Sequence, residues 1–270
     1  MNTPKIALSS RYSRSAQELL DFARAHALDG IEYTIRAESD EELELEKDVM
    51  RLLAASELEI RYHLQFFKVE LAHADRKTAA SSCAYICRVL DFLHGIGGKT
   101  VIIHLCLGYR TALEQTCRAH GETFLTEVVR HASSLGMEVC LENLTFGLVN
   151  TPENFLHFLD VTGAAATIDI GHVASSPCVL TGAISAPEYV KAVAPRLRSA
   201  HIYDIELPNP ETGKFVHHPP MSRECLEERI NALKGSPCTW WLIELGDPQD
   251  ILRTAGFLRD IIRNWKEPLS

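Results

Sequence analysis

Six apolar segments of the chain that read as buried strands each end in a side chain able to bind metal or move protons. They are EIRYHL with His63, TVIIHL with His104, EVCLENL with Glu142, AATIDIG with Asp169, RSAHIYD with His201 and TWWLIEL with Glu244. An unpaired carboxylate is expensive to bury, so its recurrence at strand ends needs one common explanation. Carboxylates and imidazoles that converge in a low-dielectric site are neutralised and organised by a cation.

The elements that must position these residues alternate along the chain. Short β-branched runs are followed by longer stretches of helical period. The predicted strands are 5–9, 30–35, 59–64, 100–105, 138–144, 165–171, 198–204 and 239–245. The predicted helices are 14–27, 39–56, 75–95, 112–135, 151–161, 185–195, 222–234 and 248–265, with Ser39, Thr151 and Ser185 at N-cap positions.

Strict alternation of eight strands and eight helices implies parallel strands joined by right-handed crossovers. In about 250 residues this predicts an α/β fold, a single (β/α)8 TIM barrel spanning residues 1–270 as one domain. An open doubly wound sheet is the alternative, but it would carry a Gly-rich first turn. The segment after the first strand is SSRYSRS, without glycine. We therefore expect the closed barrel.

The active site of such a barrel lies at the C-terminal ends of its strands. Because strand side chains alternate between faces, each polar residue from His104 onward shares a face with a small or apolar residue two positions earlier, as Glu142 does with Cys140. An ordinary structural ion pair would explain any one of these residues equally well, but it explains six together poorly. Mixed carboxylate and imidazole ligands suit a divalent ion such as Mn²⁺, Co²⁺, Zn²⁺ or Fe²⁺.

Composition limits the classes of partner. The 270 residues are 46% hydrophobic, with a formal net charge of −9 and no basic tract, so nucleic-acid binding is not expected. No apolar run is long enough to span a membrane, and the N-terminus lacks the pattern of a signal peptide. Eight cysteines without a C-x-x-C pair indicate reduced thiols. We expect a cytoplasmic enzyme.

At the strand ends the chain resembles the xylose isomerase-like TIM barrel superfamily, which contains sugar and sugar-phosphate isomerases and epimerases together with endonuclease IV. The resemblance rests on YHLQF, VIIHL, LENL, IDIGH, AHIYD and IELG, in family order. In the ketose epimerases of this group one metal is held by four residues, which correspond here to Glu142, Asp169, His201 and Glu244. The resemblance implies a divalent-metal-dependent isomerase or epimerase of a small keto-sugar or related polyol.

That resemblance also implies roles in the reaction. Glu142 and Glu244 would act as acid and base on opposite faces of the substrate, and His172 would contact it. The reaction would begin with proton abstraction alpha to a carbonyl. Family relatives often associate, so a homo-oligomer is a further expectation.

Endonuclease IV implies a different chemistry on the same rim. There His63 and His104 would bind a second metal or contact substrate, Glu142 would bridge two ions, and a phosphodiester would be hydrolysed. A third ion of that enzyme needs an Asp-x-His segment after the seventh strand; His217 matches the histidine, but Phe215 replaces the aspartate. His217 lies where substrate-covering loops are found, so substrate contact and a structural role are both open for it.

Two other interpretations concern residues around this rim. A metal-binding scaffold without catalysis is a third alternative, against which the intact ligand set argues. Several cations could reach a phosphate or carboxylate from the loops, although an ordinary surface charge is the simpler prediction for each. They are Arg11, Arg36, Lys68, Arg110 and Arg223.

Overall fold

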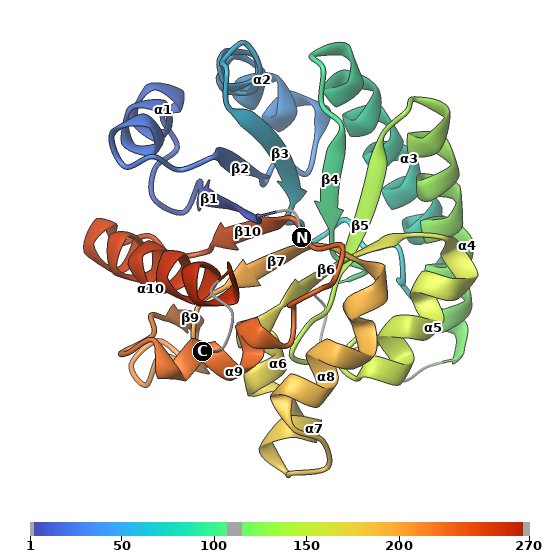
Figure 1. The fold of residues 1–270 in the computed structure, drawn as a ribbon. Helices are drawn as coiled ribbons and strands as arrows, with labels where there is room; N and C mark the ends of the chain where they lie inside the picture. Colours follow the sequence, from blue (N-terminus) through green and yellow to red (C-terminus); the bar gives the residue numbers. More distant parts are fainter. Residues whose placement is uncertain (1–2, 107–114, 267–270) are drawn as a thin grey trace.

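Eight parallel strands close into a barrel, with helices around its outside (Figure 1). The computed structural model describes residues 3–106 and 115–266. The barrel strands are β1 (Lys5–Ser9), β2 (Gly30–Ile35), β3 (Glu59–Leu64), β4 (Thr100–Ile103), β5 (Glu138–Glu142), β6 (Ala165–Asp169), β7 (Leu197–Ile202) and β10 (Trp240–Ile243). β1 closes the barrel by pairing with both β2 and β10. The predicted (β/α)8 barrel is confirmed.

The crossover helices follow the predicted order closely. They are α1 (Ala16–Ala25), α2 (Asp40–Ala54), α3 (Arg76–Gly95), α4 (Gln115–Ser134), α5 (Pro152–Thr162), α8 (Ala186–Val193) with the 3-10 turn η1 (Ala194–Arg196), α9 (Glu224–Asn231) and α10 (Pro248–Lys266). The expected helix start at 112 lies outside the described residues. Ser39, Thr151 and Ser185 cap their helices as predicted, and Ser185 forms a full capping box with Glu188.

The strongest departure from simple alternation follows β6. We expected the strand to run to residue 171, but it ends at Asp169, whose side chain accepts a hydrogen bond of 2.8 Å from the backbone N–H of His172. Asp169 thereby caps a short helix, α6 (Ile170–Ser175), which is followed by α7 (Pro177–Leu180). This turn holds His172 one helical turn from Asp169.

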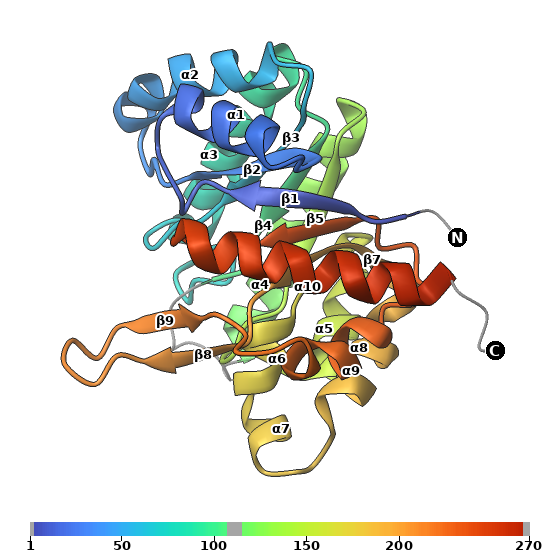
Figure 2. The ribbon, with the colours of Figure 1, turned by 60° about the vertical axis from the view of Figure 1, so that its left-hand side comes forward.

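The long segment after β7 forms a hairpin instead of the expected loop. β8 (Ile205–Pro208) pairs antiparallel with β9 (Phe215–His218), so that Glu206 lies opposite His217. Gly213 in the connecting turn has a φ of 66°, a conformation that glycine adopts without strain. The hairpin projects from the end of the barrel toward which β1 points, which is the mouth (Figure 2).

Below the mouth the barrel interior is filled by side chains. Ala7, Trp240 and Leu242 form a small buried apolar cluster separate from the large core between strands and helices. Gly30 makes room for this plug, because a Cβ at that position would collide with the Trp240 ring and the Glu59 carbonyl. Among the described residues no helix is both long and apolar enough to cross a bilayer.

Candidate metal centre

Four strand ends bring one histidine and three carboxylates together. Glu142, Asp169, His201 and Glu244 are buried and offer ligand atoms that all lie within 4.8 Å of one another. Nδ1 of His201 is 3.3 Å from a carboxylate oxygen of Glu142 and 3.3 Å from one of Glu244. Two ligands that bind one ion at about 2.1 Å lie about 3.0 to 3.4 Å apart in octahedral or tetrahedral geometry. This set fits a divalent cation.

Several buried atoms of this group lack a hydrogen-bond partner, which also favours a bound cation. Oε2 of Glu142, Oδ2 of Asp169 and both ring nitrogens of His201 are buried without a hydrogen-bond partner in the structure. Buried polar groups are nearly always paired, and orphaned ones require an explanation such as an ion. A cation held by the two carboxylate oxygens and by Nδ1 of His201 would satisfy these three atoms, whereas Nε2 of His201 faces Glu32.

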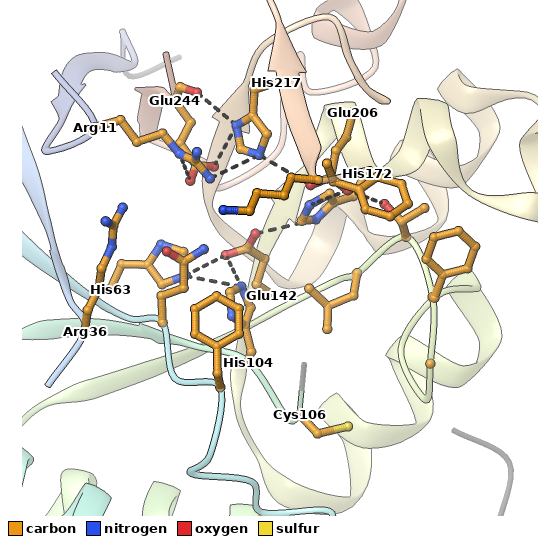
Figure 3. A pocket seen from close by; sticks show the side chains of 18 residues that line it. Arg11, Arg36, His63, His104, Cys106, Glu142, His172, Glu206, His217 and Glu244 are labelled. Atoms are coloured by element: carbon orange, nitrogen blue, oxygen red, sulfur yellow. Dashed lines mark hydrogen bonds and ion pairs between the residues drawn. The ribbon is translucent and has the colours of Figure 1, made fainter. Parts of the chain in front are cut away.

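A second group shares Glu142. Nε2 of His63 and Nε2 of His104 are each 3.3 Å from Oε2 of Glu142 and 3.3 Å from each other (Figure 3). The three atoms form a triangle of the size that ligands of one ion adopt. Glu142 thus faces both groups, as a carboxylate that bridges two ions would.

Asn143, the amide that follows Glu142, joins the ends of β5 and β6. Its side-chain oxygen accepts a hydrogen bond of 2.7 Å from the backbone N–H of Asp169, and its amide donates one of 3.2 Å to the Asp169 carbonyl. The residue is completely buried. Asn143 therefore fixes the separation of Glu142 and Asp169 where the strand ladder ends.

Glu32 is a buried carboxylate of the site that the sequence did not single out. It lies on β2, with Oε1 2.9 Å from Nε2 of His201 and 3.6 Å from Nδ1 of His63, and it accepts a hydrogen bond of 3.1 Å from Trp240. Each imidazole thus turns one nitrogen to Glu32 and the other to the mouth. The available signal was a glutamate inside the apolar run GIEYTI, in the strand just before the one that carries His63.

Arg11 was expected to be an ordinary surface charge, and this was wrong. Its guanidinium turns into the mouth, where Nε is 2.9 Å from Glu244 and Nη2 is 3.2 Å from Nε2 of His217. Arg36 lines the same cavity, whereas Lys68 and Arg223 are near Glu38 and Glu227. Arg110 lies outside the described residues.

A third group forms where the hairpin meets the barrel. His172 from α6, Glu206 from β8 and His217 from β9 offer atoms within the same 4.8 Å limit. The His217 ring stacks on Tyr203, with centroids 3.7 Å apart. The sequence did not single out Glu206, because an unstructured loop predicts no partner for it. In the hairpin Glu206 lies opposite His217 and supplies the carboxylate that Phe215 lacks.

Burial and mutual charge set the protonation of these groups. Burial would raise the pKa of Glu142, but His201, His104 and His63 hold it well below its usual value. Burial lowers the pKa of His63 to about 3, and burial raises that of Asp169 to about 6. Burial also opposes the charge of His172, yet the nearby carboxylates of Asp169 and Glu206 raise its pKa to about 10.

The three groups open into one cavity of about 540 Å³. Its wall combines polar residues with aromatic ones such as Phe67, Phe146 and Phe215 (Figure 3). A volume of this size accommodates a small ligand. Of the metal, catalytic and substrate residues predicted from the strand ends and the loop after β7, all except Asp169 and His201 line it directly, and those two belong to the same ligand group as Glu142. Their roles remain predictions.

A closed parallel barrel with carboxylates and imidazoles at its mouth defines a class of metal-binding TIM barrels. The chain belongs to the xylose isomerase-like TIM barrel family, whose model matches residues 20–261. Among curated proteins it is 28% identical over 142 residues to an uncharacterised protein of Methanocaldococcus jannaschii, which covers 53% of this chain and 58% of that protein. The match thus spans less than two thirds of that relative's length.

Solved structures with the same fold include several sugar epimerases. L-ribulose 3-epimerase superposes with a TM-score of 0.73 at 15% identity, covering 98% of this chain and all of that one. D-allulose 3-epimerase from Methylomonas sp., in complex with D-allulose, gives 0.70 at 16% identity and covers 98% of both chains. A xylose isomerase-like barrel from Mycobacterium smegmatis, in complex with magnesium, gives 0.63 at 16% identity and covers 97% of both. At these identities the likeness establishes the fold.

Proposed function

We propose that the protein is a divalent-metal-dependent isomerase or epimerase of a small keto-sugar or related polyol. The observation that carries the proposal is the pairing of Glu142 and Glu244 at one candidate metal centre, each with an oxygen 3.3 Å from Nδ1 of His201. The names of the structural neighbours, among them 3-epimerases of L-ribulose and D-allulose, support this chemistry. The magnesium complex of one neighbour supports a divalent ion.

Glu142, Asp169, His201 and Glu244 would hold the metal. When bound, it would stabilise negative charge that develops on the substrate oxygens after a proton is removed. One of the two glutamates takes the proton from the carbon next to the carbonyl, and the other returns one from the opposite face. Arg11 orients Glu244 through its 2.9 Å hydrogen bond, and His172, which lines the cavity, would contact substrate.

Exchange of a substrate C–H proton with deuterated solvent tests the proposal. Metal-loaded protein should exchange one proton of a ketose from a panel of free and phosphorylated sugars, followed by NMR. Glu142→Gln and Glu244→Gln should each lower the rate by about 10²–10⁴-fold, because each removes an acid–base group. Glu138→Gln, at the other end of β5, is the matched control. Unchanged exchange in Glu244→Gln would refute its role.

A metal-dependent phosphoesterase resembling endonuclease IV is the second candidate. The triangle of His63, His104 and Glu142 favours it, because a second ion there would activate water against a phosphodiester. In that case His104→Gln should abolish cleavage of a bis-aryl phosphate. Retained C–H exchange in the same variant, with no phosphoesterase activity in the wild type, would exclude this candidate.

The setting of the activity is also a proposal. We infer one barrel domain over residues 1–270 that works in the cytoplasm, where buried thiols such as Cys140 and Cys238 stay reduced. A carbohydrate-like small molecule is the expected partner, and the net charge of −9 disfavours nucleic acid. Self-association is tested by light scattering during gel filtration, and location by cell fractionation.

A further inference from the structure

We propose that Cys87, activated by Cys83 and His131, is a site of reversible S-thiolation, at which a low-molecular-weight disulfide forms a mixed disulfide with the protein. The three residues lie on α3 and α4, which pack against each other on the outside of the barrel (Figure 1), and none of them lines the cavity. The inference goes beyond the proposed function and needs neither the metal centre nor a substrate. It concerns the only two cysteines that the sequence places one helical turn apart.

Cys83 and Cys87 share one face of α3, because residues four apart on a helix are neighbours. Their thiols hydrogen-bond to each other. Sγ of Cys83 also lies 3.7 Å from the backbone carbonyl oxygen of Phe124 in α4. Once Cys87 is a thiolate, the Cys83 hydrogen turns to it and away from this carbonyl, because a charged acceptor makes the stronger hydrogen bond. Cys83 thus supplies a donor to the Cys87 anion.

His131 of α4 supplies positive charge at the same place when it is protonated. Its Nε2 is 2.8 Å from Oδ1 of Asp91, which lies one turn after Cys87 on α3, so this pair holds the ring beside the thiol. The carboxylates of Asp91 and Glu127 also face Cys87 and oppose its ionisation. The hydrogen bond from Cys83 outweighs burial and, together with His131, lowers the pKa of Cys87 to about 7.

Exposure distinguishes Cys87 from the buried thiols of the chain. Cys87 is half-buried, whereas Cys83 belongs to the core between strands and helices. Burial raises the pKa of Cys140 and that of Cys238 to about 12, so these two thiols stay protonated near neutral pH. A thiol attacks a disulfide fastest when its pKa is close to the ambient pH and when the disulfide can reach it. Cys87 meets both conditions.

The reaction is a thiol–disulfide exchange. The Cys87 thiolate attacks one sulfur of the disulfide RSSR, a new S–S bond forms as the old one breaks, and the second half leaves as a thiolate that takes a proton from water. An added thiol reverses the step. Cys83 does not displace the attached group, because Cβ atoms one helical turn apart are about 5–6 Å from each other and a disulfide needs about 3.5–4.5 Å. The mixed disulfide therefore persists while α3 stays helical.

Exchange with a small neutral disulfide tests the inference on the full-length protein. The protein is treated with 2-hydroxyethyl disulfide from about pH 5 to about pH 9, and peptide mass spectrometry follows the adduct at each cysteine. The rate at Cys87 should have its midpoint near pH 7. The adduct should form at Cys87 before it forms at Cys178 and Cys225, the other two half-buried thiols, and dithiothreitol should remove it.

Two substitutions at Cys83 separate its hydrogen bond from its packing. Cys83→Ala removes the donor, so the midpoint at Cys87 should rise to about 8.5 or above. The rate at about pH 6 should then fall by about fivefold, because the loss of thiolate exceeds the gain in nucleophilicity of the more basic sulfur. Cys83→Ser keeps a donor and should retain the low midpoint.

Cys225→Ser is the matched control, because it removes a half-buried thiol that has Ser222 and no cysteine beside it. It should leave both the rate and the midpoint at Cys87 unchanged. The same midpoint in Cys83→Ala as in the wild type would overturn the activation by Cys83. Reaction at Cys178 and Cys225 without an adduct at Cys87, or a Cys83–Cys87 disulfide in its place, would overturn the site.

Discussion

Glu142 stands at the junction of two groups of ligand atoms. A single oxygen, Oε2, lies 3.3 Å from Nε2 of His63, from Nε2 of His104 and from Nδ1 of His201. Three imidazoles around one buried oxygen explain why the pKa of Glu142 stays low despite complete burial. The glutamate that ends β5 is thus an anion at the point where cations would gather.

Glu32 should tune metal binding without contacting the metal. Its Oε1 lies 2.9 Å from the outer nitrogen of His201 and 3.6 Å from that of His63, so its charge orients both rings. Glu32→Gln should weaken Co²⁺ or Mn²⁺ binding by about 10–100-fold, because outer partners of ligating histidines typically contribute this much. Calorimetric titration measures the change, with Glu138→Gln as control. Equal affinity in both variants would contradict the role of Glu32.

His63 should make the metal-free protein sensitive to acid. Its pKa falls from 6.5 to about 3 on folding, so the unfolded chain binds a proton below pH 6.5 that the folded protein does not. The stability contributed by His63 is present above pH 6.5 and is lost as the pH falls toward 3. Between pH 7 and pH 5 this amounts to about 2 kcal/mol.

Urea unfolding of chelator-treated protein at pH 7 and pH 5 tests this expectation. The wild type should lose about 2 kcal/mol more stability over this interval than His63→Gln, which does not titrate. Comparing pH intervals removes the fixed cost of the substitution. The same loss in both proteins would assign the acid sensitivity to other groups.

At the level of the elements, the short helix α6 packs closely against the site through Gly171. Gly171 lies between Asp169 and His172, and a Cβ there would overlap the ring of Tyr203, which is buried and stacks on His217. Gly171→Ala should therefore destabilise the protein by about 1–3 kcal/mol through overpacking, and it should weaken metal binding by displacing Asp169, whose side chain caps α6. Thermal unfolding and metal titration measure both effects.

Gly256→Ala in α10 is the matched control for this substitution. No atom lies within 4 Å of a Cβ at that position, and alanine favours a helix interior. It should leave the stability unchanged or raise it by up to about 1 kcal/mol. If Gly171→Ala behaved in the same way, α6 would be free to shift and would not fix His172.

For the whole molecule, a cation at the mouth would offset repulsion among buried carboxylates. Four buried acids, Glu32, Glu142, Asp169 and Glu244, belong to the ligand groups at this one end of the barrel. A metal ion that binds only the folded protein, at 100 times its Kd, stabilises it by about 2.7 kcal/mol. For a chain of this size that corresponds to a rise in Tm of about 5 °C.

Calorimetric scans with excess Mn²⁺ or Co²⁺ and with a chelator measure this difference. The wild type should show it, and Asp169→Asn should show much less of it because one ligand is lost. Identical Tm values for loaded and chelated wild-type protein would contradict metal binding by the folded barrel.

The sequence by itself determined the barrel and the residues at its strand ends. Local period sets which face of a strand a side chain occupies, so His104 or Glu142 could be directed to the mouth without a structure. The partners of these residues were decided only by the tertiary structure. Glu32, Arg11 and Glu206 reach the mouth from β2, a loop and a hairpin, and their contacts join segments far apart in sequence. No local pattern encodes such distances, because they depend on barrel closure, on the turn after β6 and on the register of the hairpin.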